Sequence, residues 1–265
     1  MDEIAEYNKA RWKALVEADA LFTRPKFDLD YDSAKDLVNP NNRFGEVKGK
    51  EILCLASGGG KQSAAFALLG ANVTVFDISE EQLERDRLAA EHYEIEIKTV
   101  QGDMRNLSDF ERGAFDIVYH PYSINFVPDS TEVFEQIAKV IKTDGIYYFS
   151  FANPFTMGIS QIDWYGEGYL LKKPYVSKAE IIYDDQNWVY DKTENEPIPR
   201  PKEYRHTLSE LINGLIDLDF LIRNVSDNED MHPDLKSEPA SWDHFVAFAP
   251  PWLSVLAVYK PDLEF

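Results

Sequence analysis

Residues suited to ligand chemistry follow the ends of four predicted strands. They are, in chain order, Gly58 and Gly60, Asp77, Asp103 with Met104, and His120. Glycine lets a backbone turn tightly and approach a ligand closely, because it has no Cβ. A carboxylate such as Asp77 can accept protons from two neighbouring hydroxyls, which suits a ribose diol. The residue types and their order therefore indicate a site for a ligand that contains a nucleoside.

Alternating strands and helices are expected to position these residues. Apolar runs predict strands at 52–56, 72–77, 94–100, 115–119 and 146–151. Helices are predicted between them at 64–69, 79–92 and about 129–141, and Ser79 begins a capping box. This pattern is typical of a doubly wound α/β fold, in which the carboxyl ends of parallel strands share one edge and bind ligands. We therefore expect the residues above to meet at that edge.

The segments outside this core show weaker patterns. Residues 2–20 predict a helix with Trp12 on its apolar side, whereas 21–48 and 227–244 are expected to be irregular. A capped helix is predicted from Thr207, with strands at 220–225 and 253–259. Residues 153–205 lack a long periodic apolar pattern, so we expect them to form an insertion rather than a second domain. They are called the insertion below. Its aromatic residues are Trp164, Tyr165, Tyr169, Tyr175, Tyr183, Trp188 and Tyr190.

Composition limits the partners and the compartment. The formal net charge is −20 over 265 residues, and such an acidic surface repels nucleic acid and anionic membranes. Cys54 is the single cysteine, which excludes an internal disulfide and favours the reducing cytoplasm. Its position in mid-strand predicts a buried apolar side chain. No metal-ligand spacing, signal peptide or long apolar run is present, so a soluble cytoplasmic protein without a metal is expected.

Several motifs together resemble the class I S-adenosylmethionine-dependent methyltransferases, and more closely a bacterial and archaeal group often labelled type 11 methyltransferases. They are Leu-Cys-Leu-Ala-Ser-Gly-Gly-Gly at 53–60, Gly-Asp-Met at 102–104, His-Pro at 120–121, Asn-Phe-Val-Pro at 125–128, Phe-Ala-Asn-Pro at 151–154 and His-Thr-Leu at 206–208. The resemblance covers most of the chain and thins out over 155–200 and 227–250. It implies a Rossmann-like methyltransferase fold with a mostly parallel seven-stranded sheet in the order 3-2-1-4-5-7-6. The last strand would be antiparallel, and the insertion would follow strand 5.

The same resemblance assigns a cofactor, S-adenosyl-L-methionine, whose product is S-adenosyl-L-homocysteine. It implies one domain made of an N-terminal helix and cap (1–48), a cofactor-binding core (49–152), the insertion or lid (153–205) and a C-terminal helix with strands (206–265). The implied contacts are Ala56, Ser57, Gly58 and Gly60 around the methionine part, Asp77 with Ile78 at the ribose, Asp103 and Met104 at the adenine, and His120 near the sulfonium or acceptor. Two positions depart from the wider superfamily. Cys54 replaces the usual acid of the first strand, and Ala56 replaces the usual first glycine.

The acceptor side is less defined by sequence. His120 and His206 are the candidate general bases, the first at the ligand edge and the second just before a capped helix. Tyr122, Asn125 and Asn153 follow strand ends and could orient an acceptor. The aromatic insertion could be a lid over a small-molecule acceptor or a separate apolar cluster.

Three functions are compatible with these residues. The first is methyl transfer to a small-molecule acceptor. The second is a non-catalytic protein that binds S-adenosylmethionine, such as a sensor. The third is an NAD-dependent oxidoreductase, but its fingerprint expects a third glycine where Ser63 stands, and it leaves Asp103 and Met104 without a role.

Overall fold

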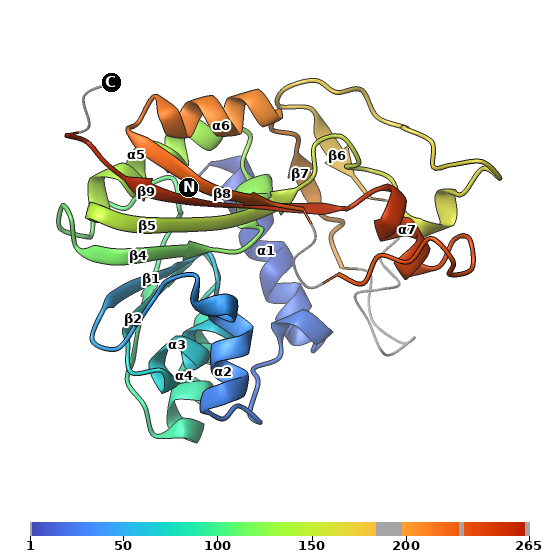
Figure 1. Ribbon diagram of the computed structural model, residues 1–265. Coiled ribbons are helices and arrows are strands. Elements are labelled where there is room, and N and C mark those ends of the chain that lie inside the picture. The colour runs from blue at the N-terminus through green and yellow to red at the C-terminus, as the bar shows by residue number, and fades with distance from the viewer. Residues whose placement is uncertain (1, 184–197, 228–230, 263–265) are drawn as a thin grey trace.

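The protein is built on a seven-stranded sheet in the order β3-β2-β1-β4-β5-β9-β8 (Figure 1). The computed structural model describes residues 2–183, 198–227 and 231–262. Strands β1 to β5 run parallel, whereas β9 runs antiparallel to both β5 and β8. Since β8 and β9 are the sixth and seventh strands of this sheet along the chain, the predicted fold class and strand order are confirmed.

The elements have the following bounds. The strands of the sheet are β1 (Glu51–Leu55), β2 (Asn72–Asp77), β3 (Ile97–Gln101), β4 (Phe115–His120), β5 (Ile141–Ala152), β8 (Phe220–Ser226) and β9 (Trp252–Tyr259). The helices are α1 (Glu3–Glu17), α2 (Tyr31–Val38), α3 (Gln62–Leu68), α4 (Glu80–Tyr93), α5 (Ser130–Val140), α6 (Leu208–Ile216) and α7 (Trp242–Phe248). A separate antiparallel hairpin pairs β6 (Glu180–Ile182) with β7 (Lys202–Tyr204).

Helices cover both faces of the sheet, and an apolar cluster lies on each side (Figure 1). In β1, Leu53 and Leu55 pack in the cluster that includes α5 and α6, whereas Ile52 and Cys54 pack in the cluster that includes α2, α3 and α4. Successive strand residues point to opposite faces, so a strand that is buried on both faces is a continuous apolar run. Cys54 is fully buried, which confirms its predicted packing role.

Side-chain caps explain where several helices begin. The Ser79 side chain accepts the N–H of Gln82 at the start of α4, and Asp129 accepts an N–H at the start of α5. Thr207 and Glu210 form a reciprocal capping box at α6. These caps satisfy N–H groups that have no partner within the helix. Within the part of the chain that the structure describes, no helix combines the length and the apolar character needed to span a membrane.

Three elements differ from the expectation. Residues 21–48 were expected to be irregular, but they include α2, whose capping box joins Asp30 and Ser33. Residues 227–244 were also expected to be irregular, yet α7 begins at Trp242, after an N-cap at Ser241. Strand β5 begins at residue 141 rather than 146, because residues 143–145 continue the strand with a local irregularity, in which Asp144 has a φ of 65°. Short elements such as these carry too few periods for a clear sequence pattern.

A buried arginine holds the insertion in place. Arg205 follows β7 and is 1% exposed. Its guanidinium donates hydrogen bonds to the backbone carbonyls of Met157, Lys173 and Pro174. Arg205, two residues after Glu203, therefore fixes the segments around residue 157 and around residues 173–174 to the end of β7.

Candidate functional site

A cavity of about 1350 Å³ lies at the carboxyl ends of the parallel strands. One side of it, here called the strand-end wall, consists of Ala56, Ser57, Gly58, Asp77, Ile78, Asp103 and Met104. The other sides come from α1, the segment after β4, parts of the insertion with its hairpin, α7 and the start of β9. The structure thus brings most of the residues proposed for cofactor binding to one place.

The glycine loop after β1 packs tightly against its surroundings. A Cβ on Gly58 would lie 2.7 Å from the Cβ of Gln82 and 3.1 Å from Oδ2 of Asp77, so a larger residue does not fit. Gly60 is not among the described residues that line the cavity. Its N–H instead donates to Asp86, which also accepts the N–H of Gly59. Gly60 therefore holds the conformation of the loop through Asp86, on the side away from the cavity.

Asp77 is 8% exposed and faces the cavity at the end of β2. Its two carboxylate oxygens accept the backbone N–H groups of Gly58 and Ser79, each at 2.9 Å. Burial raises the pKa of this carboxyl, whereas those hydrogen bonds act in the opposite direction. Each oxygen retains a second lone pair, so Asp77 can still accept protons from ligand hydroxyls.

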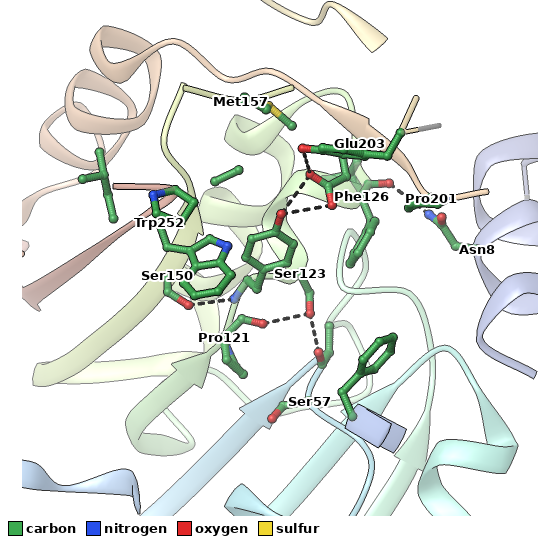
Figure 2. Close-up of a pocket in the computed structure, with 18 of the residues that line it drawn as sticks. Asn8, Ser57, Pro121, Ser123, Phe126, Ser150, Met157, Pro201, Glu203 and Trp252 are labelled. Carbon is green, nitrogen blue, oxygen red and sulfur yellow. Dashed lines mark hydrogen bonds between the residues drawn. The ribbon is translucent and has the colours of Figure 1, made fainter. Parts of the chain in front are cut away.

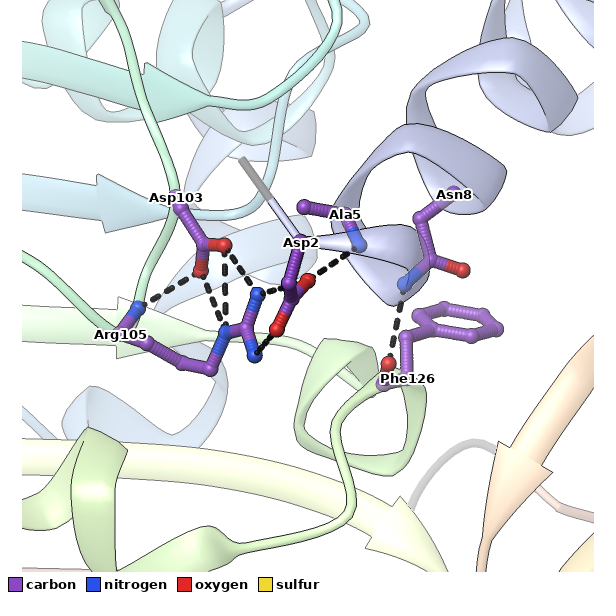
Figure 3. Close-up of polar contacts among 6 residues, drawn as sticks. All are labelled: Asp2, Ala5, Asn8, Asp103, Arg105 and Phe126. Carbon is purple, nitrogen blue, oxygen red and sulfur yellow. Dashed lines mark hydrogen bonds and ion pairs between the residues drawn. The ribbon is translucent and has the colours of Figure 1, made fainter.

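Asp103 takes part in an ion-pair network that reaches the N-terminus (Figure 3). The Arg105 guanidinium donates to Asp103 at 2.6 and 3.1 Å and to Asp2 at 2.6 and 2.9 Å. Asp2 is also the N-cap of α1, since its side chain accepts the N–H of Ala5. The network, here called the clasp, therefore attaches the first turn of α1 to the strand-end wall.

Two polar atoms, one in the strand-end wall and one beside it, are buried without a hydrogen-bond partner among the described residues. They are Oγ of Ser57 and Oε1 of Gln82, and both residues line the cavity. Buried polar groups in proteins almost always have partners. Polar atoms of a ligand would supply them, which fits a cofactor with amino, carboxylate and hydroxyl groups.

The residue before Ser57 has an uncommon backbone conformation. Ala56 has a φ of 46°, in the left-handed region that favours glycine. This conformation explains why glycine is usual at this position in the proteins that the sequence resembles. Its backbone is held from both sides, because its N–H donates to the carbonyl of Phe76 and its carbonyl accepts the hydroxyl of Ser123.

Neither candidate histidine is among the described residues that line the cavity. His120 is fully buried, its Nδ1 lies 3.0 Å from the Tyr147 hydroxyl, and burial lowers its pKa to about 3. His206 is 3% exposed, and its Nε2–H donates to the carbonyl of Ile124. Burial also lowers the pKa of His206. Their placement gives no support to the predicted roles in cofactor contact and proton transfer, because strand and loop geometry turn both rings into the core.

A carboxylate that the sequence did not single out faces the cavity instead. Glu203, in β7, is 4% exposed and accepts hydrogen bonds from the hydroxyls of Tyr122 and Tyr183, with all oxygen–oxygen distances at 3.0 Å. Burial raises the pKa of Glu203 to about 7, and the positive charge of Arg11 opposes this shift. Figure 2 shows Glu203 on the side of the cavity opposite Ser57.

The other residues proposed for the acceptor side have separate positions. Tyr122 lines the cavity and has a φ of 60°, an uncommon conformation that is often retained at functional sites. The amide of Asn125 bonds to the backbone of Ala152, and that of Asn153 bonds to the backbone of Pro250. Both amides therefore fix the loops that surround the cavity.

The described aromatic residues of the insertion have separate positions. Tyr165 is exposed and Tyr175 stacks on Phe155, whereas the others form two groups. Tyr183 lines the cavity, together with residues 156–163. Trp164 and Tyr169 pack against α7 instead, where the Tyr169 hydroxyl lies 2.9 Å from Nδ1 of His244. Both interpretations of the insertion thus describe part of it. Residues 188 and 190, a tryptophan and a tyrosine, lie outside the described residues.

Comparisons with known proteins agree with this geometry. The family described as a methyltransferase domain matches residues 53–149. The uncharacterized methyltransferase YbaJ of Bacillus subtilis (strain 168) is 34% identical over 213 residues, which cover 80% of this chain and 81% of that protein. A ubiquinone biosynthesis O-methyltransferase of Cronobacter sakazakii is 28% identical over 207 residues, covering 73% and 78% of the two chains.

Solved structures show the same fold at low sequence identity. An S-adenosylmethionine-dependent methyltransferase from Mesorhizobium loti has a TM-score of 0.63 and 21% identity, with 88% of this chain and all of that chain covered. The geranyl diphosphate C-methyltransferase of Streptomyces coelicolor A3(2), solved in complex with S-adenosyl-L-homocysteine, has a TM-score of 0.56 and 15% identity, with 86% and 78% covered.

Proposed function

Because the chain belongs to the class I S-adenosylmethionine-dependent methyltransferases, we propose that it methylates a small molecule held in the cavity beside the cofactor. Its cofactor is S-adenosyl-L-methionine, and S-adenosyl-L-homocysteine is the product. One observation carries the proposal. The strand-end wall carries residues suited to the cofactor, and the same cavity extends beyond it to residues of α1 and the insertion.

The wall offers each part of the cofactor a suitable surface. Ser57 and Gly58 would contact the methionine part, where the unpartnered hydroxyl of Ser57 can bond. Asp77 would accept the ribose hydroxyls, with Ile78 beside it. Asp103 accepts three N–H groups of Arg105, from its backbone nitrogen, Nε and Nη2, so one of its four lone-pair positions remains for the adenine amino group.

When bound, the cofactor supplies an electrophilic methyl group on a sulfonium sulfur. The chain mainly contributes position, because its rigid walls can hold an acceptor in the orientation needed for attack. Such positioning can lower a barrier by about 7–11 kcal/mol. The walls also replace water around the acceptor with apolar side chains such as Phe126 and Trp252.

The acceptor is a small molecule rather than a nucleic acid in this proposal. The net charge of −20 opposes the approach of polyanions, and residues of α1, the insertion and α7 surround the cavity beyond the strand-end wall. Relatives named as ubiquinone biosynthesis O-methyltransferases support an oxygen acceptor. We place the reaction in the cytoplasm, since the single cysteine, Cys54, is a buried thiol.

The alternative functions have less support. Where an NAD fingerprint expects glycine, Ser63 is buried and its hydroxyl bonds to Asp86. Glu203 favours an enzyme over a non-catalytic cofactor-binding protein, because this buried carboxylate lines the cavity and can accept a proton from a bound acceptor.

Replacing Asp77 tests the proposed ribose contact. In the wild type, two carboxylate oxygens are available to the N–H groups of Gly58 and Ser79 and to the ribose hydroxyls. In the Asp77→Asn variant, a single amide oxygen must accept all of these hydrogen bonds. We expect calorimetric titration to show more than about tenfold weaker binding of S-adenosyl-L-methionine. The exposed Asp109→Asn variant is the matched control. Unchanged affinity in a folded Asp77→Asn protein would remove the assignment.

A further inference from the structure

We infer that Glu203 is the general base of the acceptor site, and that the acceptor is an aromatic hydroxyl compound whose O–H it binds. This inference rests on the proposed function. It adds a catalytic residue, in β7, and a chemical class of substrate to the methyl transfer.

The hydrogen bonds of Glu203 leave room for a ligand. A carboxylate offers four lone-pair positions, and the hydroxyls of Tyr122 and Tyr183 supply two protons. Glu203 is 4% exposed and lines the cavity, so water has little access to the remaining positions. A hydrogen-bond donor on a bound acceptor would satisfy them.

The surroundings of Glu203 also suit proton transfer near neutral pH. Its ionisable neighbours come from three elements: Tyr122 after β4, Tyr183 after β6, and Arg11 on α1. The two hydroxyls and the positive charge stabilise the carboxylate, while burial favours the acid, and the pKa is raised to about 7. A base with a pKa near the working pH is the most effective in general-base catalysis.

The geometry of the cavity favours a flat, apolar acceptor. Phe126 and Trp252 lie between Glu203 and Ser57 (Figure 2). Tyr122, whose hydroxyl bonds to Glu203, also lines the cavity. Aromatic surfaces pack well against a planar ring. For methyl transfer, the hydroxyl oxygen that Glu203 holds must also face the methyl group of the cofactor, so the acceptor ring would lie against these aromatic side chains with its hydroxyl between Glu203 and the cofactor.

Acidity selects an aromatic hydroxyl among the possible donors. A phenol such as tyrosine has a pKa of about 10, only about 3 units above Glu203, whereas water has a pKa of about 15.7. An aliphatic alcohol, which resembles water, would therefore be a poor proton donor to this carboxylate. An ammonium group has a similar pKa, about 10.4 for lysine, so acidity separates only the two kinds of hydroxyl. The aromatic lining of the cavity favours a neutral phenol over a charged amine, because burying a charge beside apolar side chains costs more.

The step balances without a further reactant. An electron pair on the acceptor oxygen forms the new bond to the methyl carbon, and the carbon–sulfur bond breaks with its electron pair going to sulfur. The hydroxyl proton passes to a free lone pair of Glu203. An aryl methyl ether and a protonated Glu203 result, and the proton then leaves to solvent.

Binding of a matched pair of probes tests the inference without knowledge of the natural acceptor. The probes are 2-naphthol and 2-methoxynaphthalene, in which a methyl group replaces the hydroxyl proton. Each probe is titrated into protein loaded with S-adenosyl-L-homocysteine. The variants are Glu203→Gln and, as a matched control, Glu180→Gln at the exposed end of the same hairpin. We expect 2-naphthol to bind at least about tenfold tighter than the ether to wild type and to the control. In Glu203→Gln this difference should fall below about threefold.

A pH series separates a base from a structural carboxylate. Binding of 2-naphthol to wild type should strengthen between pH 5.5 and 8, as Glu203 loses its proton, whereas binding to Glu203→Gln should stay flat. In Tyr183→Phe the midpoint should move to higher pH, because the Tyr183 hydrogen bond lowers the pKa of Glu203.

Two results would overturn the inference while leaving the proposed function in place. One is that S-adenosyl-L-homocysteine binds but 2-naphthol binds no tighter than its ether. The other is that Glu203→Gln keeps the full difference between the probes. Failure of S-adenosyl-L-homocysteine itself to bind would overturn the proposed function and this inference together.

Discussion

At the scale of single residues, two buried carboxyl groups with similar electrostatics have different positions. Burial raises the pKa of both Asp86 and Glu203 to about 7. Asp86 lies behind the glycine loop, where Gly59, Gly60 and Ser63 donate to it, and it is not among the described residues that line the cavity. Glu203 faces the cavity. A raised pKa marks a functional group only where a substrate can reach it.

The raised pKa of Glu203 predicts a pH-dependent contribution to stability. The folded state holds the proton to about pH 7, whereas an ordinary glutamate loses it near pH 4.5. The stabilisation is therefore complete below pH 4.5 and is lost as the pH rises through 7. We expect the free energy of unfolding of wild type, minus that of Glu203→Gln, to fall by on the order of 3 kcal/mol from pH 4.5 to 8.

Urea denaturation across this pH range measures the difference. The Glu180→Gln variant makes the same chemical change at an exposed position of β6 and serves as the control. Parallel stability curves for wild type and Glu203→Gln would mean that this carboxyl titrates alike in the folded and unfolded chains. That result would contradict the burial argument.

At the scale of elements, α1 is a wall of the cavity held by polar contacts. Ala5, Asn8, Arg11 and Trp12 line the cavity, and the Asn8 side chain donates to the carbonyl of Phe126 (Figure 3). The clasp fixes the first turn of the helix. Two of α1's buried residues, Asn8 and Arg11, are polar, so its attachment depends on these pairings as well as on apolar contact.

Breaking the clasp should loosen α1 without removing its cap. Asparagine caps helices about as well as aspartate, so Asp2→Asn keeps the cap and loses the charge pair with Arg105. Asp2 is half-exposed, and such pairs contribute about 0.5–1 kcal/mol. We expect trypsin to cleave within α1, at Lys9 and Lys13, about two- to fivefold faster, as measured by mass spectrometry of the released peptides.

The control is Asp30→Asn, the same substitution at the N-cap of α2, where the partner is Ser33. Cofactor should slow cleavage in both variants if α1 covers it. Equal cleavage of α1 in Asp2→Asn and Asp30→Asn would show that the clasp does not hold this helix.

The same elements show what a sequence can predict. Strand β1 and the glycine loop were predictable, because a long apolar run followed by glycines has few other structures. The hairpin of β6 and β7 was not, because strands of three residues have no measurable period. Glu203 lies among prolines and charges, which resembles a solvated surface. Its burial arises from Tyr122 and Tyr183, which are 81 and 20 residues away.

The histidines show a second limit of sequence patterns. His120 was predicted to contact the ligand from its place after a strand. Successive strand residues point to opposite faces of the sheet, so a shift of one residue reverses the direction of a side chain. The neighbouring Tyr119 lines the cavity, whereas His120 packs against Tyr147 in the core. A sequence gives the end of a strand only to within a residue or two, so it cannot choose between the two faces.

At the scale of the whole molecule, two parts of the chain that are far apart in sequence close one cavity. The Tyr7 hydroxyl of α1 donates to the carbonyl of Arg200, and Nζ of Lys202 lies 4.2 Å from the centre of the Tyr7 ring. The sheet supplies the strand-end wall, whereas α1 and the hairpin supply residues of the other sides. Cofactor and acceptor are therefore expected to depend on different parts of the fold.

Calorimetric titration of the wild-type chain with S-adenosyl-L-methionine, S-adenosyl-L-homocysteine and NAD tests the central claim most directly. The strand-end wall, with Asp77 and the unpartnered Ser57 hydroxyl, predicts micromolar binding of the first two and no binding of NAD. Binding of NAD alone would contradict the account. Binding of none of the three would also contradict it, since the cavity would then lack the cofactor site on which each role proposed for its residues depends.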